Sequence, residues 1–299
     1  MAIVYEIEHV TTYRYDKPVT LGEHRAMFLP RGSHAGRILG YSVETNVPSR
    51  VHWIMDTLAN NVAVIDFEAP TTELILTCRF EGIHFGSKGV EAFPLDARAK
   101  DIPVQYTPDE WIDLAVYMRP HAEDPDGSVA AWARSFVAGD QSDTSAALKR
   151  IMDTIRDTFQ YQAREAEGTQ TPVETLATKS GTCRDYAWLM IETLRRLGLA
   201  CQFVSGYLYD PALDGCEVGR VGSGATHAWL AVYLPGAGWL PYDPTNRITE
   251  GFDLIPVAVA RHPGQAVPLA GAWFGDANDY RGMDVKVSVR KISDISAFD

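Results

Sequence analysis

The sequence contains few cysteines, and none of them lies in a pattern that binds a metal or exchanges electrons. There are four cysteines in 299 residues, and no two of them form a C-x-x-C motif. That spacing argues against a zinc knuckle and a thioredoxin-like redox pair. Four cysteines in a chain of this size do not indicate a disulfide scaffold. Cys78 and Cys201 lie in apolar strand-like runs, where a cysteine is usually a small buried hydrophobe. We expect no metal and no other cofactor.

Clusters of positive charge and long apolar runs are also lacking. The formal net charge is −12 and the sequence has no cluster of Lys and Arg, so phosphates and anionic membrane surfaces would repel the chain. No stretch approaches the ~20 apolar residues that span a bilayer. The start, MAIVYEIEHVTTYRY, lacks the basic region and cleavage site of a signal peptide and predicts a strand. We expect a cytoplasmic protein that binds neither nucleic acid nor membrane.

The remaining composition is that of an ordinary globular protein, and the length favours two domains. Residues 1–95 contain short runs such as RVHWIMD, NVAVIDFEA and TELILTCRF, with turn signals between them. These runs predict an antiparallel, sandwich-like β-domain. Residues 96–142 mix Pro, Asp and Gly with two short amphipathic helical patterns and are interpreted as a helical connector. Residues 143–299 are expected to form a core domain with C-terminal strands.

The core domain begins with helical patterns and continues with strands. An apolar stripe with helical spacing runs from Leu148 to Phe159, and TPVETLATKSG has the capping box of a short helix. Thr182 is a suitable N-cap for a helix that starts at Cys183 and ends at Gly198. The runs ACQFVSGYLY, THAWLAVYL and WLPYDPTN predict strands, and the tail is expected to add further strands to the same sheet. The predicted fold class is α+β.

Three residues of this domain have the chemistry of a Cys-His-Asp triad. Cys183 lies at a predicted helix N-terminus, which favours the thiolate form of its side chain. His227 and Asp243 follow on consecutive strands, and a Cys–His pair needs a third group that fixes the imidazole. Each residue alone also has an ordinary role: a cysteine packs near a helix start, a histidine packs on a strand face, and Asp-Pro begins a turn. The combination favours catalysis.

The register of the strand pair decides whether His227 and Asp243 can meet. A hairpin with PGAG as its complete loop would put the two side chains on opposite faces, because side chains alternate along a strand. A register shifted by one residue, or a bulge at Pro241, puts both on one face. We therefore predict a turn centred near residues 235–236, or a bulge at Pro241.

Longer motifs are similar to those of the bacterial transglutaminase-like proteins, which are often labelled cysteine proteases. The core motifs are GTCRDYAWLM, THAWLAVYLPGAGWLPYDPTN and IPVAVARHPGQAVPLAG, and the β-domain contains HVTTYRYDKPV, so the resemblance covers nearly the whole chain. It implies a papain-like core, in which a nucleophile helix packs on an antiparallel sheet, preceded by a β-domain. It also implies that Cys183 is the nucleophile, His227 the general base and Asp243 the orienting residue.

Two segments depart from the patterns usual in this family. The β-domain turn DTLANN has Ala59 where D-x-x-G-N has glycine, and VAVARHPG has Ala260 and His262 where V-x-V-G-R-D has Gly and Asp. Neither departure touches the three proposed catalytic positions, so both bear on substrate contacts and not on the triad.

The resemblance implies cysteine-dependent acyl transfer or hydrolysis at a carboxamide or peptide bond, through a thioester, with a peptide or protein as substrate. The oxyanion would be stabilised by the backbone N–H of Cys183 and by a side-chain donor from Tyr161 or Gln162. Arg184 is expected at the lip of the cleft. Trp229 fits either the cleft wall or the core.

Three alternatives to hydrolysis are left open by the residues. The acyl group could pass to an amine, as in a cross-linking protein-glutamine transferase, because the sequence does not decide whether water or an amine attacks the thioester. The same fold could instead serve as a non-catalytic peptide-binding module, although such a module does not need a thiol, an imidazole and a carboxylate. A structural metal site is the weakest alternative, because no closely spaced set of ligands is present.

Overall fold

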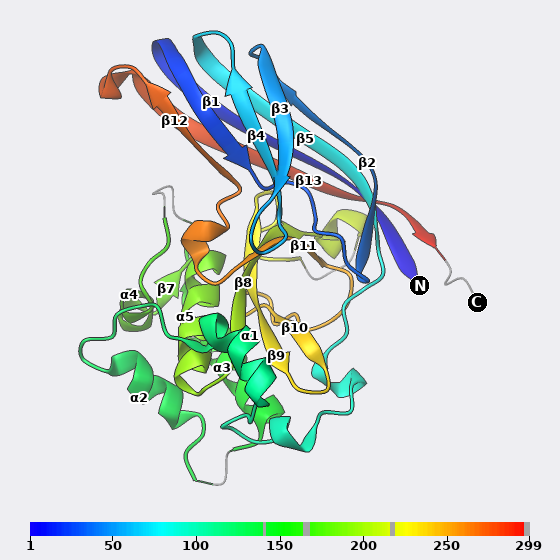
Figure 1. The fold of residues 1–299 in the computed structure, drawn as a ribbon, viewed down its shortest axis with the longest axis vertical. Helices are drawn as coiled ribbons and strands as arrows, with labels where there is room; N and C mark the ends of the chain where they lie inside the picture. Colours follow the sequence, from blue (N-terminus) through cyan, green and yellow to red (C-terminus); the bar gives the residue numbers. More distant parts are fainter. Residues whose placement is uncertain (140–141, 164–167, 216–218, 296–299) are drawn as a thin grey trace.

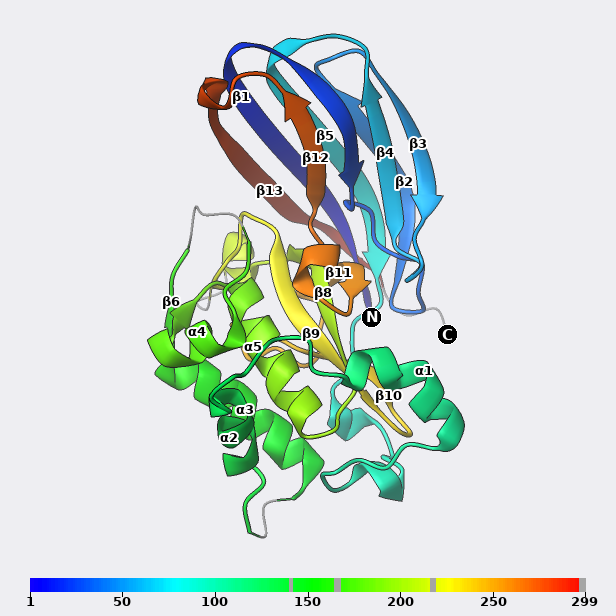
Figure 2. The ribbon, with the colours of Figure 1, turned by 60° about the vertical axis from the view of Figure 1, so that its left-hand side comes forward.

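The chain folds into a β-domain and a mixed core domain that lie one above the other (Figure 1, Figure 2). The computed structural model describes residues 1–139, 142–163, 168–215 and 219–295. Its antiparallel sheets and its helices confirm the predicted α+β class. In this part of the chain no helix is long and apolar enough to cross a membrane.

The β-domain is built around β1 (Ala2–Ala26), a strand of 25 residues at the start of the chain. Its first half pairs with β5 and its last residues pair with β4, so β1 belongs to both halves of a folded sheet. The strand order is β2-β5-β1-β4-β3. The strands added to β1 are β2 (Gly36–Thr45), β3 (Ser49–Met55), β4 (Asn61–Phe67) and β5 (Thr71–His84).

The last two strands of the chain return to the β-domain. β13 (Tyr280–Ile295) runs antiparallel to residues 2–15 of β1, and β12 (Leu269–Phe274) runs antiparallel to residues 20–26. The expectation that the tail extends the core sheet is therefore wrong for β12 and β13, and right for β11 (Leu254–Ala260), which pairs with β8. Alternation along a segment identifies a strand, but it carries no information on which edge the strand joins.

The core sheet has the order β10-β9-β8-β11. It is formed by β8 (Cys201–Leu208), β9 (His227–Leu234), β10 (Gly238–Tyr242) and β11. The helices are α1 (Pro108–Met118), α2 (Ser128–Ser135), α3 (Thr144–Thr158), α4 (Pro172–Thr178) and α5 (Cys183–Arg196). The two-residue strands β6 (Gln160–Tyr161) and β7 (Ser180–Gly181) pair in parallel before α5. Short 3₁₀ turns occur at Val90–Ala92, Ala97–Ala99, Pro211–Asp214, Pro263–Gln265 and Ala277–Asp279.

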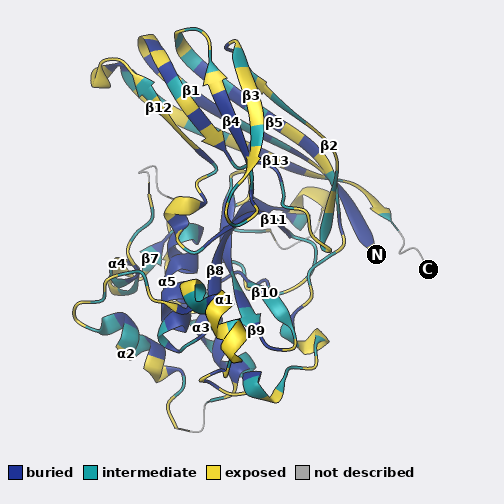
Figure 3. Ribbon diagram, in the orientation of Figure 1, coloured by how far each residue is buried: buried dark blue, intermediate teal, exposed yellow. Residues whose placement is uncertain are grey.

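The helix α5 packs on β8 and β9 and is buried along almost its whole length (Figure 3). Such burial requires partners for its polar side chains. The carboxylate of Glu192 is buried and accepts hydrogen bonds from the backbone N–H of His121 and Ala122, each at 3.0 Å. It also forms ion pairs with Arg195 and Arg196, at 3.0 and 2.7 Å. These bonds fix α5 against the chain that joins α1 to α2, so the helix is a rigid support for its first residue.

The turn between β3 and β4 fastens the β-domain to the edge of the core sheet. The buried side chain of Asn60 donates to the carbonyl of Val259 on β11 at 2.8 Å and accepts from its N–H at 2.9 Å. Asp56 accepts hydrogen bonds from the backbone N–H and the Nδ2 of Asn60, both at 2.8 Å. Ala59 lies between them with φ 59°, a left-handed conformation that favours glycine. The departure from D-x-x-G-N thus preserves the shape of the turn with a less suitable residue.

Candidate active site

Cys183 is the first residue of α5 because its neighbours fix the helix start. Oδ2 of the buried Asp185 accepts hydrogen bonds from the N–H and the hydroxyl of Thr182, at 2.8 and 3.0 Å. Oδ1 accepts one from the N–H of Gln170 at 2.6 Å. A Cβ at Gly181 would lie 2.8 Å from the Cβ of Asp185, so this close approach requires glycine. The thiol lies at the positive end of the helix, where a thiolate is favoured.

The hairpin of β9 and β10 has the register that a His–Asp contact requires. Gly238 pairs with Leu234, and the register continues without a shift to the end of β10. The turn is centred on residue 236, so the predicted turn position is confirmed and no bulge is needed. His227 and Asp243 consequently point to the same side of the sheet and are diagonal neighbours.

His227 and Asp243 form a buried pair beside the start of α5. Nε2 of His227 donates to Oδ2 of Asp243 at 2.9 Å, and neither side chain is accessible to solvent. Oδ1 of Asp243 accepts a hydrogen bond from the N–H of Thr245 at 2.8 Å, and Oδ2 accepts one from Nδ2 of Asn246 at 3.1 Å. The other ring nitrogen, Nδ1, makes no regular hydrogen bond within the described chain and is left for the thiol of Cys183, which interacts with the ring.

The electrostatics of the three groups favour a thiolate–imidazolium pair. Burial raises the pKa of the Cys183 thiol, but the charge and close approach of the His227 ring and the N–H of Ala228 outweigh burial, so the pKa lies below its ordinary value. Burial lowers the pKa of His227, but the charges of Asp243 and Cys183 raise it more, to about 10. Burial raises the pKa of Asp243, but the charge and the hydrogen bond of His227 hold that pKa below its usual range. Each charge stabilises its neighbour.

Of the two donors considered for the oxyanion, Tyr161 is the one beside the thiol. The pairing of β6 with β7 puts Tyr161 opposite Gly181, and its side chain interacts with that of Cys183. Burial and the charge of Cys183 raise the pKa of Tyr161 well above its ordinary value, so the hydroxyl keeps its proton. Gln162 is exposed and bonds through its backbone N–H to the carbonyl of Gly181 at 2.9 Å.

Gly222 and Asn246 complete the surroundings of the imidazole, and the sequence patterns did not single them out. Oδ1 of Asn246 accepts from the N–H of Val221 at 2.8 Å, and Nδ2 donates to the Val221 carbonyl at 3.1 Å. Gly222 has φ 87°, and a Cβ there would lie 3.2 Å from the hydroxyl of Tyr161 and 3.3 Å from Nδ1 of His227. The loop backbone thus covers the ring, and Asn246 ties it to the carboxylate. The only sequence signal was the last residue of DPTN.

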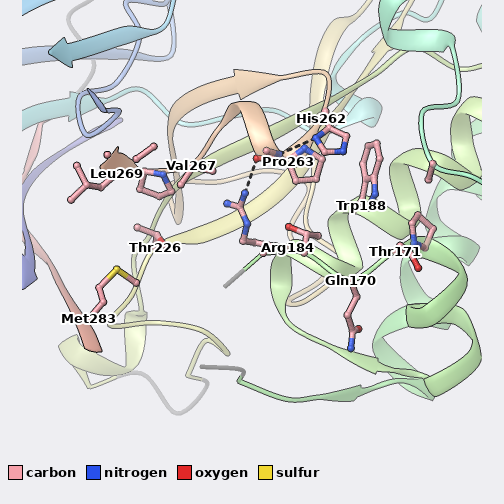
Figure 4. A pocket seen from close by; sticks show the side chains of 18 of the residues that line it. Gln170, Thr171, Arg184, Trp188, Thr226, His262, Pro263, Val267, Leu269 and Met283 are labelled. Carbon is pink, nitrogen blue, oxygen red and sulfur yellow. Dashed lines mark hydrogen bonds between the residues drawn. The ribbon is translucent and has the colours of Figure 1, made fainter. Parts of the chain in front are cut away.

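The side chains of Trp229 and Arg184 do not project into an open cleft. Trp229 is 2% exposed and stacks on His227 with ring centroids 6.0 Å apart, so it supports the imidazole from the core. The guanidinium of Arg184 donates to the carbonyls of Pro263 and Ala266, at 2.8 and 3.4 Å. Arg184 lines a groove beside the site, but its charge is turned into the wall (Figure 4).

Comparisons with known proteins agree with this architecture. Residues 130–244 match the transglutaminase-like superfamily core, and residues 5–81 match the bacterial transglutaminase-like N-terminal region. An uncharacterized protein of Mycobacterium leprae is 28% identical over 294 residues, which cover 96% of this chain and 98% of that protein. A protein-glutamine gamma-glutamyltransferase of Pseudomonas aeruginosa is 34% identical over 87 residues, which cover 25% of this chain and 12% of that protein.

A solved structure has the same fold over the whole chain. The crystal structure of a candidate cysteine protease from Cytophaga hutchinsonii superposes with a TM-score of 0.74 at 16% sequence identity, and the alignment covers 100% of this chain and 94% of that one. Both the core and the β-domain thus have counterparts in known proteins, in the order in which they occur here. The chain belongs to the transglutaminase-like superfamily and carries the bacterial transglutaminase-like N-terminal region in front of its core.

Proposed function

We propose that the protein transfers the acyl group of a carboxamide or peptide bond through a thioester on Cys183. The observation that supports this proposal most is the buried contact between His227 and Asp243, at 2.9 Å, beside a thiol at a helix start. Cys183 is the proposed nucleophile, His227 the acid and base, and Asp243 the orienting residue. Burial of an ion pair costs several kcal/mol of desolvation, and a module that only binds peptides has no use for that cost.

In the acylation half, the thiolate of Cys183 attacks the carbonyl carbon and forms a C–S bond. The electron pair of the C=O bond moves to oxygen, where the backbone N–H of Cys183 and the hydroxyl of Tyr161 stabilise the negative charge. The imidazolium of His227 then gives its Nδ1 proton to the leaving nitrogen, the C–N bond breaks, and an amine or ammonia departs. A thioester and a neutral imidazole are left, with Asp243 holding Nε2–H.

In the deacylation half, neutral His227 takes a proton from water while the water oxygen attacks the thioester. The tetrahedral intermediate collapses, the C–S bond breaks, and a carboxylic acid leaves. The thiolate of Cys183 and the imidazolium are restored, so the cycle closes without another reactant. A primary amine in place of water would yield a new amide by the same steps.

Amine transfer is the second candidate function, and one observation favours it. A quarter of this chain is 34% identical over 87 residues to a protein named as a protein-glutamine gamma-glutamyltransferase. We keep hydrolysis first because the same catalytic steps need only water. A peptide or protein substrate and a cytoplasmic location are predictions that accompany both candidates.

The test is alkylation of the intact protein at pH 6 with limiting iodoacetamide, read by peptide mass spectrometry in wild type and in His227→Ala. An ordinary thiol with a pKa of ~8.5 is about 0.3% ionised at that pH. Each unit by which a thiol's pKa is lowered reduces its intrinsic nucleophilicity about threefold, so the net advantage of a paired thiolate over an ordinary thiol is at most about tenfold at this pH. Cys78 and Cys201 are internal references, because burial raises the pKa of each to about 12.

The expected result is that Cys183 labels ahead of the other three cysteines and loses that lead in His227→Ala. The alanine leaves more room at the thiol, so slower labelling in the variant cannot result from blocked access. If Cys183 labels no faster than the others, or equally fast in both proteins, the proposed ion pair is wrong and a non-catalytic role takes its place.

A further inference from the structure

A groove between the β-domain and the core runs past the start of α5 (Figure 4). Its volume is about 1220 Å³, and its wall includes Arg184 and Thr226. Arg184 follows the proposed nucleophile Cys183, and Thr226 precedes His227. The groove therefore passes beside the start of α5 and the start of β9, and the described residues that line it include the chain neighbours of Cys183 and His227 but not these two side chains. Pockets for small molecules have volumes of about 300–1,000 Å³, so this one has room for a run of several residues.

Aromatic rings form walls on both sides of the groove. On the β-domain side, the ring of Trp273 lies 5.2 Å from that of Tyr15 and 6.2 Å from that of Tyr280, measured between centroids. On the core side, the ring of Trp188 lies 5.0 Å from that of His262. Such surfaces gain free energy by removing apolar groups of a ligand from water and offer few sites that require a charged partner.

The groove is nearly uncharged although the chain has a formal net charge of −12. Among the described residues that line it, Glu123 is the one carboxylate and Arg184 the one arginine or lysine. Arg184 uses its charge on the carbonyls of Pro263 and Ala266. Burial lowers the pKa of His262, so this ring is neutral at neutral pH. A charged side chain would lose its hydration there without gaining a partner.

We infer that this groove binds an extended, uncharged polypeptide segment next to the reactive carboxamide, and that the β-domain supplies one of its two walls. The inference rests on the proposed acyl transfer at Cys183 and names the class of substrate for it. It gives the β-domain a role in the reaction, since β1, β12 and β13 all contribute to the groove. It also gives meaning to His262, which stands where the related V-x-V-G-R-D pattern has a carboxylate.

The test measures binding of three fluorescein-labelled decapeptides with a central glutamine to the full-length Cys183→Ala protein by fluorescence anisotropy. In the first peptide the residues on either side of the glutamine are Pro, Leu, Tyr and Ala. In the second peptide four of these residues are replaced by Glu, and in the third the same four are replaced by Lys. We expect the uncharged peptide to bind at least about tenfold tighter than the Glu peptide, because burying an unpaired charge costs more than the 1.4 kcal/mol of a tenfold change.

Two substitutions in the Cys183→Ala background place a carboxylate on each wall. His262→Asp keeps the acceptor for the N–H of Gly264, which Nδ1 now binds at 3.0 Å. Met283→Glu acts at a side chain of the β-domain wall that is 43% exposed. Both substitutions should weaken binding of the uncharged peptide, and the Lys peptide should then bind tightest of the three. Ile292→Glu is the matched control, since Ile292 is 47% exposed on the same strand as Met283 and does not line the groove.

The outcomes separate this inference from the proposed function. Equal binding of all three peptides, no binding of any, or equal effects of Met283→Glu and Ile292→Glu would overturn the groove assignment. Because binding is measured without the thiol, it does not depend on the ion pair at Cys183. Fast alkylation of Cys183 without a peptide preference would refute only the groove assignment. A peptide preference with slow alkylation of Cys183 would refute only the proposed catalysis.

Discussion

Replacing Ala59 by glycine should stabilise the protein, because the turn between β3 and β4 holds this residue in a left-handed conformation. Its φ is 59°, and its N–H donates to the carbonyl of Asp56 at 3.0 Å. Asn60, the next residue, is fixed by Asp56 on one side and by the backbone of Val259 on the other. The turn therefore cannot relax at Ala59 without breaking buried hydrogen bonds that join the two domains.

The magnitude follows from two opposing terms. A left-handed conformation costs a non-glycine residue about 1–2 kcal/mol. Glycine loses about 0.4–1 kcal/mol more conformational entropy than alanine on folding. The free energy of unfolding of Ala59→Gly should thus exceed that of wild type by about 0.5–1 kcal/mol, which corresponds to a Tm higher by about 2 °C.

Urea unfolding followed by circular dichroism measures this difference, with the m-value expected to stay unchanged. Ala131→Gly is the matched control, since Ala131 is an exposed residue inside α2 and its replacement should cost about 1 kcal/mol. The two alanine-to-glycine changes should have opposite signs. If Ala59→Gly lowers stability as Ala131→Gly does, the left-handed strain argument is wrong.

Three other predictions concern the site itself. Alkylation of Cys183 should begin at a lower pH and rise less steeply toward about pH 9 than that of an ordinary thiol, because the thiol loses its proton below its ordinary pKa while His227 keeps its own up to about pH 10. Asp243→Asn should restore the steep rise of an ordinary thiol, and an unchanged profile in that variant would contradict the charge argument. Asn246→Ala should steepen the same profile, since the carboxylate loses a donor at 3.1 Å, whereas a profile equal to wild type with a lower Tm would make Asn246 merely structural. Gly181→Ala should lower the free energy of unfolding by about 1–3 kcal/mol and slow the alkylation of Cys183, because the new Cβ would lie 2.8 Å from the Cβ of Asp185. An unchanged free energy of unfolding in urea would disprove this close contact.

The elements of the fold were predictable where their signals are local. Thr171 and Glu174 form the predicted capping box, with the N–H of Thr171 donating to the Glu174 carboxylate at 2.9 Å. The helix predicted from Cys183 begins at that residue and ends at Arg196. The partners of β12 and β13 were not predictable, because a strand's own alternation fits any edge of suitable polarity. Only the three-dimensional course of β1, which presents an edge to each of them, decides the pairing.

The site was predictable to the extent that the alternation of side chains along a strand determines it. Alternation alone required a shifted register before His227 and Asp243 could meet, and the observed turn has it. Side-chain alternation did not distinguish Tyr161 from Gln162, because the pairing of β6 with β7 decides which of these neighbours faces the thiol. Strand alternation also did not show what covers the face of β9 that carries Trp229, because this depends on the neighbouring strands. The indole packs so closely on Gly206 of β8 that a Cβ there would lie 2.7 Å from it.

The β-domain is bound to the site at a point that ordinary domain contacts would not require. The N–H of Val287 on β13 donates to the carbonyl of Gly224 at 2.9 Å, and Gly224 belongs to the loop whose backbone covers the imidazole of His227. The same loop is tied to the carboxylate through Asn246. The last strand of the chain and the last residue of the DPTN motif therefore hold one short loop from two sides. A chain that folds its C-terminus back onto its first strand places that strand where it can support the site, so the β-domain is structurally part of the proposed active site.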